Sequence, residues 1–364
     1  MPFRNVRFSS YRNLADAELD TSAERIFLVG ENGQGKTNFL EALYYLSFGS
    51  SFRGNADGEA VRHGEPSFLL EAATSPSFES SLPPEMIRIS YDGSAKEIRR
   101  SGKRVSDRKE LVELNPAVVF CHEDFSIADG EPEKRRVFFD QVAGLVSGTY
   151  LDDLRSFKRV LRQRNAALKD RQLSILDLLD EQFVDKGLLL MRQRASLREE
   201  VAGLFSDIYE EVSHLGRKVE LSFRPSWGHG TDPDAAALVA LLSERRNGEL
   251  MMGTSLSGPH RDRWVFTCEG RNFAATASTG QLRLLSLVLR ALQARYYTLK
   301  TARKPVLLLD DVLLELDPEK RKRFFSTIPD SSQAFFTFLP GERWEDYHSS
   351  SVIVYRVADG RFSS

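Results

Sequence analysis

Gly30-Glu31-Asn32-Gly33-Gln34-Gly35-Lys36-Thr37 is the stretch that decides the fold. It matches the P-loop pattern G-x-x-x-x-G-K-[S/T] at every fixed position. The apolar residues 25–29 before it predict a strand, and residues 36–48 after it predict a helix, which is the context that the pattern requires. We interpret all eight residues as a phosphate-binding loop for ATP. Its glycines expose backbone N–H groups to phosphates, Lys36 neutralises the β- and γ-phosphates, and Thr37 offers its hydroxyl to Mg²⁺.

A second motif lies more than 270 residues further on, where the apolar residues 305–309 end in Asp310 and Asp311. A buried strand that ends in two carboxylates would fix negative charge beside a metal ion. We expect Asp310 to hold Mg²⁺ together with Thr37, and Asp311 to polarise the attacking water. Lys36, Asp310 and Asp311 are therefore the predicted catalytic residues. The alternative is that the carboxylates cap the next helix. The wide separation from the P-loop excludes the small nucleotide kinases.

A third motif, Ala277 to Gln281, precedes a predicted helix that reaches Ala294 and stands about 30 residues before Asp310. Alone, Ser and Thr before a helix are more often simple N-caps. Together with the other two motifs, however, the segment resembles the signature of ABC-type ATPases. That resemblance implies that its residues contact ATP bound to a second subunit: Ser278, Thr279, Gly280 and Gln281. Most ABC ATPases carry Glu at the position of Asp311, and the shorter side chain here suggests slow hydrolysis.

Four further stretches resemble the RecF family, of the SMC/Rad50-like group, and they span the whole ATPase core. They are Tyr11-Arg12-Asn13-Leu14, Val118 to Asp124, Ser257-Gly258-Pro259-His260-Arg261-Asp262, and Leu307 to Asp317. The resemblance implies an α/β fold, an ABC-ATPase head with a RecA-like core, an antiparallel β-subdomain and an inserted α-helical lobe. It also adds Arg12 and Asn13 to the ATP-binding residues.

The chain departs from the family pattern in several places. No glutamine occurs between Val118 and Asp124, so His122 or Glu123 is expected to replace the Q-loop residue. Leu314 stands where a D-loop serine is usual, and Arg263 where a second aspartate is common. Thr337 takes the switch position that many transporter ATPases give to His. For His260 and Arg261, a solvated turn is the alternative to a functional role.

The periodicity along the chain predicts where the lobe is inserted. Residues 86–105 alternate like hairpin strands, whereas residues 150–212 show long helical periodicity with almost no Gly or Pro. After strands at 264–273, the chain is predicted to end with helix, strand, helix and strand. We expect an N-terminal part of the core at 1–145, a helical lobe at 146–250 and a C-terminal part of the core at 251–364.

Charge and composition limit the possible partners. With 50 Lys and Arg against 52 Asp and Glu, the net charge is −2, so DNA contacts must come from local basic patches. Two groups of basic residues are candidates for binding DNA phosphates, one on a predicted helix and one on the predicted hairpin. The first group is Arg155, Arg159 and Arg162, and the second is Arg99, Arg100, Lys103 and Arg104. Either group could instead be ordinary solvated surface.

The two cysteines, Cys121 and Cys268, exclude a disulfide framework and are expected to be reduced core residues. The first ten residues lack the apolar run of a secretory signal, and no stretch approaches the ~20 apolar residues that span a bilayer. We therefore expect a cytoplasmic protein with no membrane partner.

The resemblance to RecF implies a weak, DNA-stimulated ATPase of recombinational repair and replication. Its cofactors would be ATP and Mg²⁺. ATP would promote a homodimer that clamps double-stranded DNA or single-stranded/double-stranded junctions, and slow hydrolysis would reset it. The implied partners are RecO, RecR and RecA, with links to the SOS response. The alternatives are the ATPase subunit of a transporter and an ATP-dependent nuclease.

Overall fold

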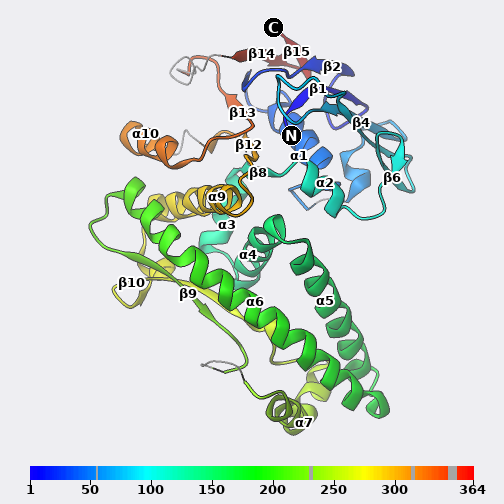
Figure 1. Cartoon of the computed structure of the whole chain (residues 1–364), viewed down its shortest axis with the longest axis vertical. Helices are drawn as coiled ribbons and strands as arrows, with labels where there is room; N and C mark the ends of the chain where they lie inside the picture. The colour runs from blue at the N-terminus through cyan, green and yellow to red at the C-terminus, as the bar shows by residue number, and fades with distance from the viewer. Residues whose placement is uncertain (55, 229–232, 313–315, 343–350) are drawn as a thin grey trace. The chain divides into compact units, whose positions relative to one another are not determined.

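The structure is a computed structural model that describes residues 1–54, 56–228, 233–312, 316–342 and 351–364 (Figure 1). The described chain divides into two compact units. One combines Met1–Asp124 with Gln293–Ser364, and the other is Phe125–Leu292. We call them the end unit and the middle unit. The domain boundaries near residues 145 and 250 stay a prediction.

A largely parallel sheet forms the centre of the end unit, with strand order β15-β14-β3-β13-β12-β8. The strands are β3 (Arg25–Val29), β8 (Ala117–Phe120), β12 (Val306–Leu309), β13 (Gln333–Phe338), β14 (Val352–Ala358) and β15 (Arg361–Ser363). All residues of β8, β12 and β13 are buried, as expected for strands covered on both faces. Parallel pairing of β3, β12 and β13 brings their carboxyl ends to one edge of the sheet.

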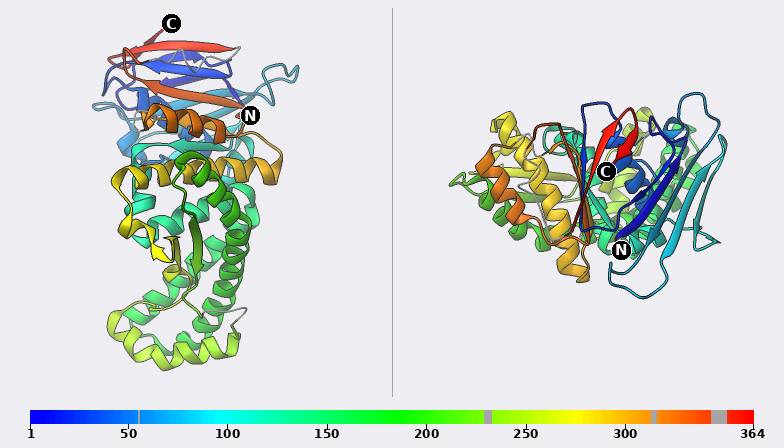
Figure 2. Two further views of the ribbon diagram at one scale, coloured as in Figure 1. Left: turned by 90° about the vertical axis from the view of Figure 1, so that its left-hand side faces the viewer. Right: turned by 90° about the horizontal axis from the view of Figure 1, so that it is seen from above.

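Helices cover both faces of this sheet (Figure 2). On one face, α1 (Lys36–Phe48) packs into a core that contains Ile26, Leu308 and Phe335. On the other, α10 (Pro318–Thr327) places the Phe325 ring 6.2 Å from that of Phe336. The sheet is therefore shielded from water, apart from its edges.

An antiparallel sheet of order β2-β1-β4-β5-β6-β7 completes the end unit, and the ring of Phe8 packs 5.8 Å from that of Phe39 on α1. Its strands are β1 (Phe3–Ser9), β2 (Ala17–Asp20), β4 (Phe68–Thr74), β5 (Glu85–Tyr91), β6 (Lys96–Arg100) and β7 (Lys103–Arg104). Three short helices belong to this unit: η1 (Asp57–Ala60) precedes β4, α2 (Lys109–Leu114) joins β7 to β8, and η2 (His122–Asp124) follows β8.

In the middle unit, the long helices α5 (Gly148–Lys169) and α6 (Leu173–Ser213) run side by side (Figure 1). Their contact includes the stacked rings of Phe157 and Phe183, with centroids 5.4 Å apart. The remaining helices are α3 (Phe125–Asp129), α4 (Pro132–Val146), α7 (Ala235–Met252), η3 (Pro259–Arg261), α8 (Phe273–Thr276) and α9 (Thr279–Thr301), whose last turns belong to the end unit. A small antiparallel sheet has the order β11-β10-β9, from β9 (Val219–Arg224), β10 (Arg263–Cys268) and β11 (Arg271–Asn272).

Two buried arginines hold the middle unit together. Arg164 donates hydrogen bonds of 2.7 Å each to Asp180 on α6 and to Glu249 on α7. Arg194 on α6 bonds Asp140 on α4 and Asp262 after η3. Removing one member of such a network leaves a buried charge without its partner, which is strongly destabilising. These networks fix the relative positions of the helices within this unit.

Several sequence predictions are confirmed by these elements. The strand at 25–29 and the helix at 36–48 have the predicted bounds, and Cys121 and Cys268 are both buried and not in a disulfide. The predicted helix, strand, helix and strand after residue 273 are present as α9, β12, α10 and β13, but the chain does not end there. Two further strands follow β13: β14 pairs with β3 in parallel, and β15 pairs with β14 antiparallel.

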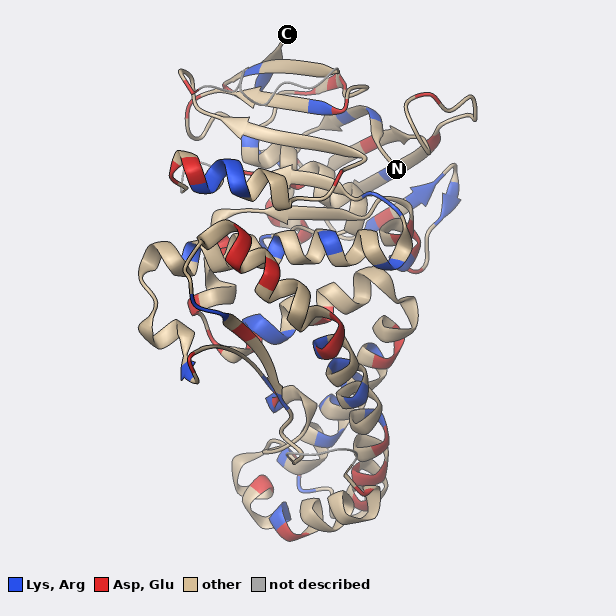
Figure 3. Cartoon of the chain, turned by 60° about the vertical axis from the view of Figure 1, so that its left-hand side comes forward, with Lys and Arg blue, Asp and Glu red and all other residues tan. Residues whose placement is uncertain are grey.

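Charge is distributed unevenly along the helices (Figure 3). On α5, two acidic residues at 152–153 are followed by basic residues alone, whereas α6 carries both signs along its length. The helix α10 carries an unbroken basic run at residues 320–323. Across the described ranges, no helix is both long enough and apolar enough to cross a membrane.

Candidate nucleotide-binding site

The P-loop joins β3 to α1 in a conformation that only its glycines allow. Gly33 and Gly35 have φ of 79° and 111°, in the left-handed region that side chains disfavour. A Cβ on Gly30 would lie 2.2 Å from the carbonyl oxygen of Val357. Gly35 is the N-cap of α1 and supplies no side-chain cap, so the first N–H groups of the helix are open to an anion.

The turn between β14 and β15 supports the loop from behind. The N–H groups of Asp359 and Gly360 donate to the side chain and the backbone carbonyl of Gln34, at 2.6 and 3.0 Å. On another side, the Asn13 amide donates to the Gly33 carbonyl at 3.0 Å. The sequence analysis missed this turn, although Asp-Gly between alternating residues is a strong hairpin signal.

Lys36 is buried and held at the mouth of the loop. Its Nζ donates to the carbonyl oxygens of Gly30 and Glu31, at 2.6 and 3.2 Å, and lies 4.0 Å from Oδ2 of Asp311. Only 3% of its side chain is exposed. Both partners are uncharged carbonyls, so an incoming phosphate, which is anionic and a stronger acceptor, can compete for the ammonium group.

The carboxylates after β12 meet Thr37 and Thr337 at the same edge of the sheet. The Thr37 hydroxyl donates to Oδ1 of Asp310 at 2.9 Å. The Thr337 hydroxyl lies 3.2 Å from Asp310 Oδ1 and 2.8 Å from Asp311 Oδ1, and it accepts the Asp311 N–H at 2.7 Å. Since a hydroxyl has one proton, Thr337 can donate to only one of the two carboxylates at a time.

Burial raises the pKa of Asp310 to about 6; the hydrogen bond from Thr37 opposes the shift, and the negative charge of Asp311 adds to it. Asp311 itself has φ of 52°, an uncommon left-handed conformation for a residue other than glycine. Backbone strain of this kind often occurs at functional sites.

The oxygen atoms at this edge suit Mg²⁺. Mg²⁺ prefers oxygen ligands and is usually bound through one or two carboxylates, water and substrate phosphates. The Thr37 hydroxyl and the buried Asp310 carboxylate, already 2.9 Å apart, provide such a pair beside the phosphate loop. Within the described residues, no cluster of three or more His, Cys, Asp or Glu forms a metal site made by protein alone.

Arg12 and Asn13 differ in how they approach the loop. The Arg12 guanidinium forms two hydrogen bonds with the buried carboxylate of Glu41, at 3.0 and 2.7 Å. It also donates to the Glu59 carbonyl at 2.5 Å. Its side chain is therefore committed to Glu41, whereas Asn13 directly contacts the P-loop.

His122 and Glu123 follow β8 at the same edge of the sheet. Phe120, at the end of β8, pairs with Leu309, and its carbonyl accepts the N–H of Asp310 at 2.9 Å. The side chains of His122 and Glu123 are exposed. Either is thus close in the strand register to Asp310, as a Q-loop residue should be. Leu314 lies outside the described residues.

The signature segment begins α9 in the middle unit. Ser278 and Gln281 cap the helix reciprocally: the Ser278 N–H donates to Gln281 Oε1 at 2.8 Å, and the Gln281 N–H to Ser278 Oγ at 3.3 Å. Ser278, Thr279 and Gly280 are exposed. A Cβ on Gly280 would meet no atom within 4 Å, so packing within the chain does not require glycine there.

The basic groups predicted to bind DNA are mostly exposed. Arg155, Arg159 and Arg162 lie on the exposed side of α5, and Arg155 is 3.7 Å from Asp152. On the hairpin, Arg99 pairs with Glu97 and the partly buried Arg100 pairs with Glu85, while Lys103 and Arg104 are exposed. The basic run at 320–323 on α10 was missed by the sequence analysis, although its four consecutive basic letters are plain.

His260 does not lie in a solvated turn. Its Nε2 is 3.0 Å from the Ser255 carbonyl, and burial lowers its pKa to about 4. The neighbouring Asp262 bonds Arg194 at 2.9 Å and the Ser226 N–H at 2.8 Å. Arg261 is exposed. The segment therefore has a structural role for His260 and Asp262.

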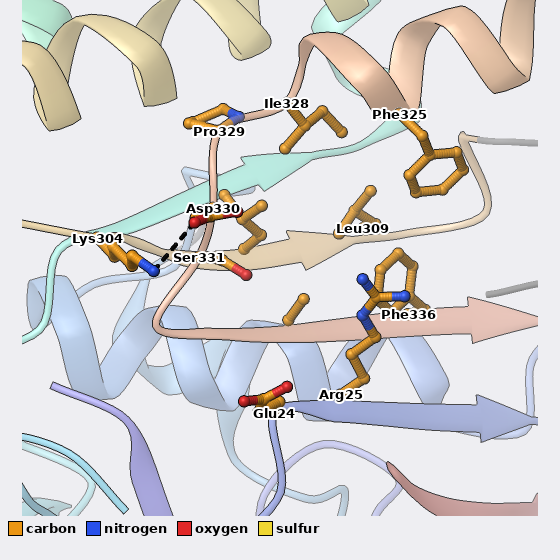
Figure 4. Close-up of a pocket in the computed structure, with 12 residues that line it drawn as sticks. Glu24, Arg25, Lys304, Leu309, Phe325, Ile328, Pro329, Asp330, Ser331 and Phe336 are labelled. Carbon is orange, nitrogen blue, oxygen red and sulfur yellow. Dashed lines mark hydrogen bonds and ion pairs between the residues drawn. The ribbon is translucent and has the colours of Figure 1, made fainter. Parts of the chain in front are cut away.

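A pocket of about 350 Å³ lies between α10 and the central sheet, and its lining runs from residues before β3, β12 and β13 along the sheet to Leu309 and Phe336 (Figure 4). Glu24, Lys304 and Asp330 line it just before β3, β12 and β13, and Lys304 pairs with Asp330 at 3.1 Å. Ligands of open α/β sheets bind at the carboxyl ends of the strands. The residues that line this pocket include none of the P-loop and neither Asp310 nor Asp311, so it is separate from the nucleotide site.

Comparison with known proteins supports one family throughout. The family model described as "RecF/RecN/SMC N terminal domain" matches residues 3–360. The DNA replication and repair protein RecF of Treponema pallidum is 38% identical over 353 residues, covering 96% of this chain and 98% of the relative. RecF of Staphylococcus carnosus is 30% identical over 370 residues, which cover 99% of this chain and 99% of the relative.

Solved structures agree in fold. The recombination mediator protein RecF bound to ATP, described in the RecFOR pathway, matches with a TM-score of 0.89 and 25% identity, over 100% of this chain and 97% of that one. An Smc head bound to the C-winged helix domain of ScpA matches with a TM-score of 0.58 and 13% identity, over 100% and 96%. The predicted fold class, an ABC-type ATPase head with an inserted helical lobe, is confirmed.

Proposed function

Because this chain belongs to the RecF family of DNA replication and repair proteins, we propose that it is a DNA clamp switched by ATP. ATP at the P-loop of one copy is contacted by Ser278 and Gly280 of a second copy, and the resulting dimer closes on DNA. The observation that carries the proposal is the convergence of Lys36, Thr37 and Asp310 at the mouth of the P-loop.

Each residue of this site has a distinct task. The N–H groups at the start of α1 and the Lys36 ammonium bind the phosphates. Thr37 and Asp310 hold Mg²⁺, which supplies positive charge next to the transferred phosphoryl group. Asp311 accepts a hydrogen bond from the attacking water and orients it. Thr337 fixes the Asp311 backbone by accepting its N–H at 2.7 Å.

The same geometry supports the proposal of slow turnover. Asp311 is one methylene shorter than glutamate, and its strained backbone with φ of 52° is tied to Thr337. A carboxylate that does not reach the water lowers the rate without weakening ATP binding. The rate of hydrolysis then sets the lifetime of the dimer, which stays closed on DNA until its ATP is hydrolysed.

The exposed Gly280 supports the proposal that the signature segment contacts ATP bound to a second copy of the chain. Glycine is less favourable than alanine in a helix, by ~1 kcal/mol in the interior and by less in the first turn, where Gly280 lies. No neighbour within 4 Å of a Cβ at Gly280 explains that cost inside one chain. A phosphate group of ATP on another subunit would need the close approach that glycine permits.

DNA is held through its backbone, mainly by Arg155, Arg159 and Arg162, and binding is weakly dependent on sequence. DNA stimulates hydrolysis. Further roles carried over from relatives are loading of RecA with RecO and RecR at gapped or junction DNA, as part of the response to DNA damage, in the cytoplasm.

ATP binding and turnover test the site directly. Wild type is expected to bind a fluorescent ATP analogue and to hydrolyse ATP slowly, faster with duplex DNA. Lys36→Met should lose binding, whereas Asp311→Asn should bind normally and lose hydrolysis. The exposed Lys218→Met is the control and should match wild type. Undiminished binding by Lys36→Met, or undiminished hydrolysis by Asp311→Asn, contradicts the proposed roles.

A further inference from the structure

A groove of about 950 Å³ lies in the middle unit, between the N-terminal turn of α4 and the strands β9 and β10. Four arginines line it: Arg136, Arg224, Arg261 and Arg263. It adjoins a second hollow of about 470 Å³, because both are lined by Pro132, Arg224 and Arg263. We call this surface the arginine groove. It is distinct from the nucleotide site, which belongs to the end unit.

Two of these arginines oppose each other in the sheet. Arg224 and Arg263 are direct cross-strand partners in the antiparallel pairing of β9 with β10, and both are exposed. Like charges directly opposite one another destabilise a sheet. Over the described part of the chain, no carboxylate lies within ion-pair distance of either. The fold thus carries a repulsion that an anionic ligand would relieve.

The other arginines add to the excess of positive charge. Arg136 donates to the carbonyl of Asp262 at 2.9 Å, and Arg261 reaches only the Ser255 carbonyl, at 3.5 Å. Neither contact neutralises a guanidinium. Arginine binds carboxylates through two parallel hydrogen bonds, and it is common in protein interfaces.

Apolar and acidic residues in the same groove indicate what kind of anion it binds. Met252 is 67% exposed and Leu256 39%, and both line the groove beside the arginines. Such side chains offer nothing to a phosphate backbone but would bury apolar side chains of a peptide. Glu131 and Glu133 also line the groove, so a ligand has to place its negative charges at the arginines and away from the glutamates. Carboxylates spaced along a peptide can do this, whereas a continuous polyphosphate would also meet the two glutamates.

We propose that the arginine groove binds an acidic segment of a partner protein, in which Asp or Glu residues are interspersed with apolar ones. Carboxylates of the segment bond Arg224 and Arg263, and its apolar side chains cover Met252 and Leu256. The groove is thereby a docking site for a protein, separate from the arginines of α5 that we assign to DNA. The inference does not depend on ATP or on the dimer.

A short labelled peptide in which Asp and Glu alternate with Leu and Phe is the probe, and fluorescence anisotropy measures its binding to the full chain. A version with Lys in place of Asp and Glu is the peptide control, and a labelled duplex is the nucleic-acid probe. The test variant is Arg224→Glu, and Arg155→Glu on α5 is the matched charge reversal.

Wild type is expected to bind the acidic peptide and not the lysine version. Arg224→Glu should weaken peptide binding at least ~10-fold and leave duplex binding unchanged, because a carboxylate replaces the guanidinium that receives the acidic side chain. Arg155→Glu should do the reverse. Arg224→Glu also turns the opposed pair with Arg263 into an attractive one, so its melting temperature should rise at low salt.

The rise in melting temperature separates lost binding from misfolding. If wild type does not bind the acidic peptide, or if Arg224→Glu melts higher and still binds it as wild type does, the proposal is overturned. If Arg224→Glu instead weakens duplex binding and Arg155→Glu does not, the groove is a nucleic-acid site and the proposal is equally wrong.

Discussion

Replacing Asp310 by Asn is expected to stabilise the nucleotide-free protein while removing its response to Mg²⁺ and ATP. The carboxylate is 9% exposed, and burial raises its pKa from 3.8 to about 6. The folded chain therefore disfavours the ionised form. Asparagine has the same shape without the charge, and its carbonyl oxygen can still accept the hydrogen bond from Thr37.

The sign and size of the effect follow from proton linkage. Well below pH 3.8 the carboxyl is protonated in both the folded and the unfolded chain, so it has no effect on the free energy of unfolding. Between pH 3.8 and about 6 the unfolded chain loses its proton more readily, and the folded chain becomes less stable as pH rises. Each unit of pKa difference corresponds to ~1.4 kcal/mol, so the full cost at neutral pH is ~3 kcal/mol.

Urea unfolding in EDTA, from acidic to neutral pH, measures this difference between wild type and Asp310→Asn. The two should unfold alike near pH 3.8 and diverge to ~3 kcal/mol at neutral pH, with the variant more stable. Asp311→Asn is the control, because that side chain is 34% exposed and should change stability by less than ~1 kcal/mol.

Mg²⁺ with ATP at ~100 times the dissociation constant should then stabilise wild type by ~2.7 kcal/mol and leave Asp310→Asn unchanged. A variant that is less stable than wild type at neutral pH would refute the reasoning. It would mean that the ionised carboxylate is favoured by its surroundings even without a metal ion.

Three further predictions concern the rest of the chain. Gly280→Ala should stabilise the chain against urea by up to ~1 kcal/mol and abolish the ATP-dependent dimer seen in sedimentation; a dimer of normal affinity would contradict the signature role. Arg194→Met should cost ~3–5 kcal/mol in urea unfolding, because it leaves two buried carboxylates unpaired; the exposed Arg198→Met is the control, and equal losses would contradict the network. Arg159→Ala should reduce the slope of log affinity for duplex against log salt by ~1; an unchanged slope would remove α5 from the DNA surface.

The sequence predicted the parts of the site that local patterns encode. The glycine-rich loop between an apolar strand and a helix predicted β3 and α1 with their observed bounds. It also predicted that Thr37 and Asp310 act together, and their side chains meet at 2.9 Å although they are far apart in the chain. Carboxylates at the end of a buried parallel strand lie at the carboxyl edge of the sheet, which is also where the P-loop begins.

Local sequence patterns could not predict interactions between segments that are distant in the chain. Arg164 belongs to a basic stretch that reads as solvated surface, yet it is fully buried because Asp180 and Glu249 come from other helices. Arg12, which stays a predicted ATP-binding residue, has its guanidinium paired with the buried Glu41, a partner that no local pattern indicated. The arginine groove likewise depends on the register that places Arg224 opposite Arg263, which neither strand encodes alone.

Sedimentation velocity with and without ATP and a gapped duplex tests the central claim, that ATP shared between two copies closes the clamp. Wild type and Asp311→Asn should dimerise on DNA when ATP is present, whereas Lys36→Met and Ser278→Arg should remain monomers. If all four proteins sediment alike in every condition, the ATP-driven dimer is wrong and only the ATPase fold and its family remain.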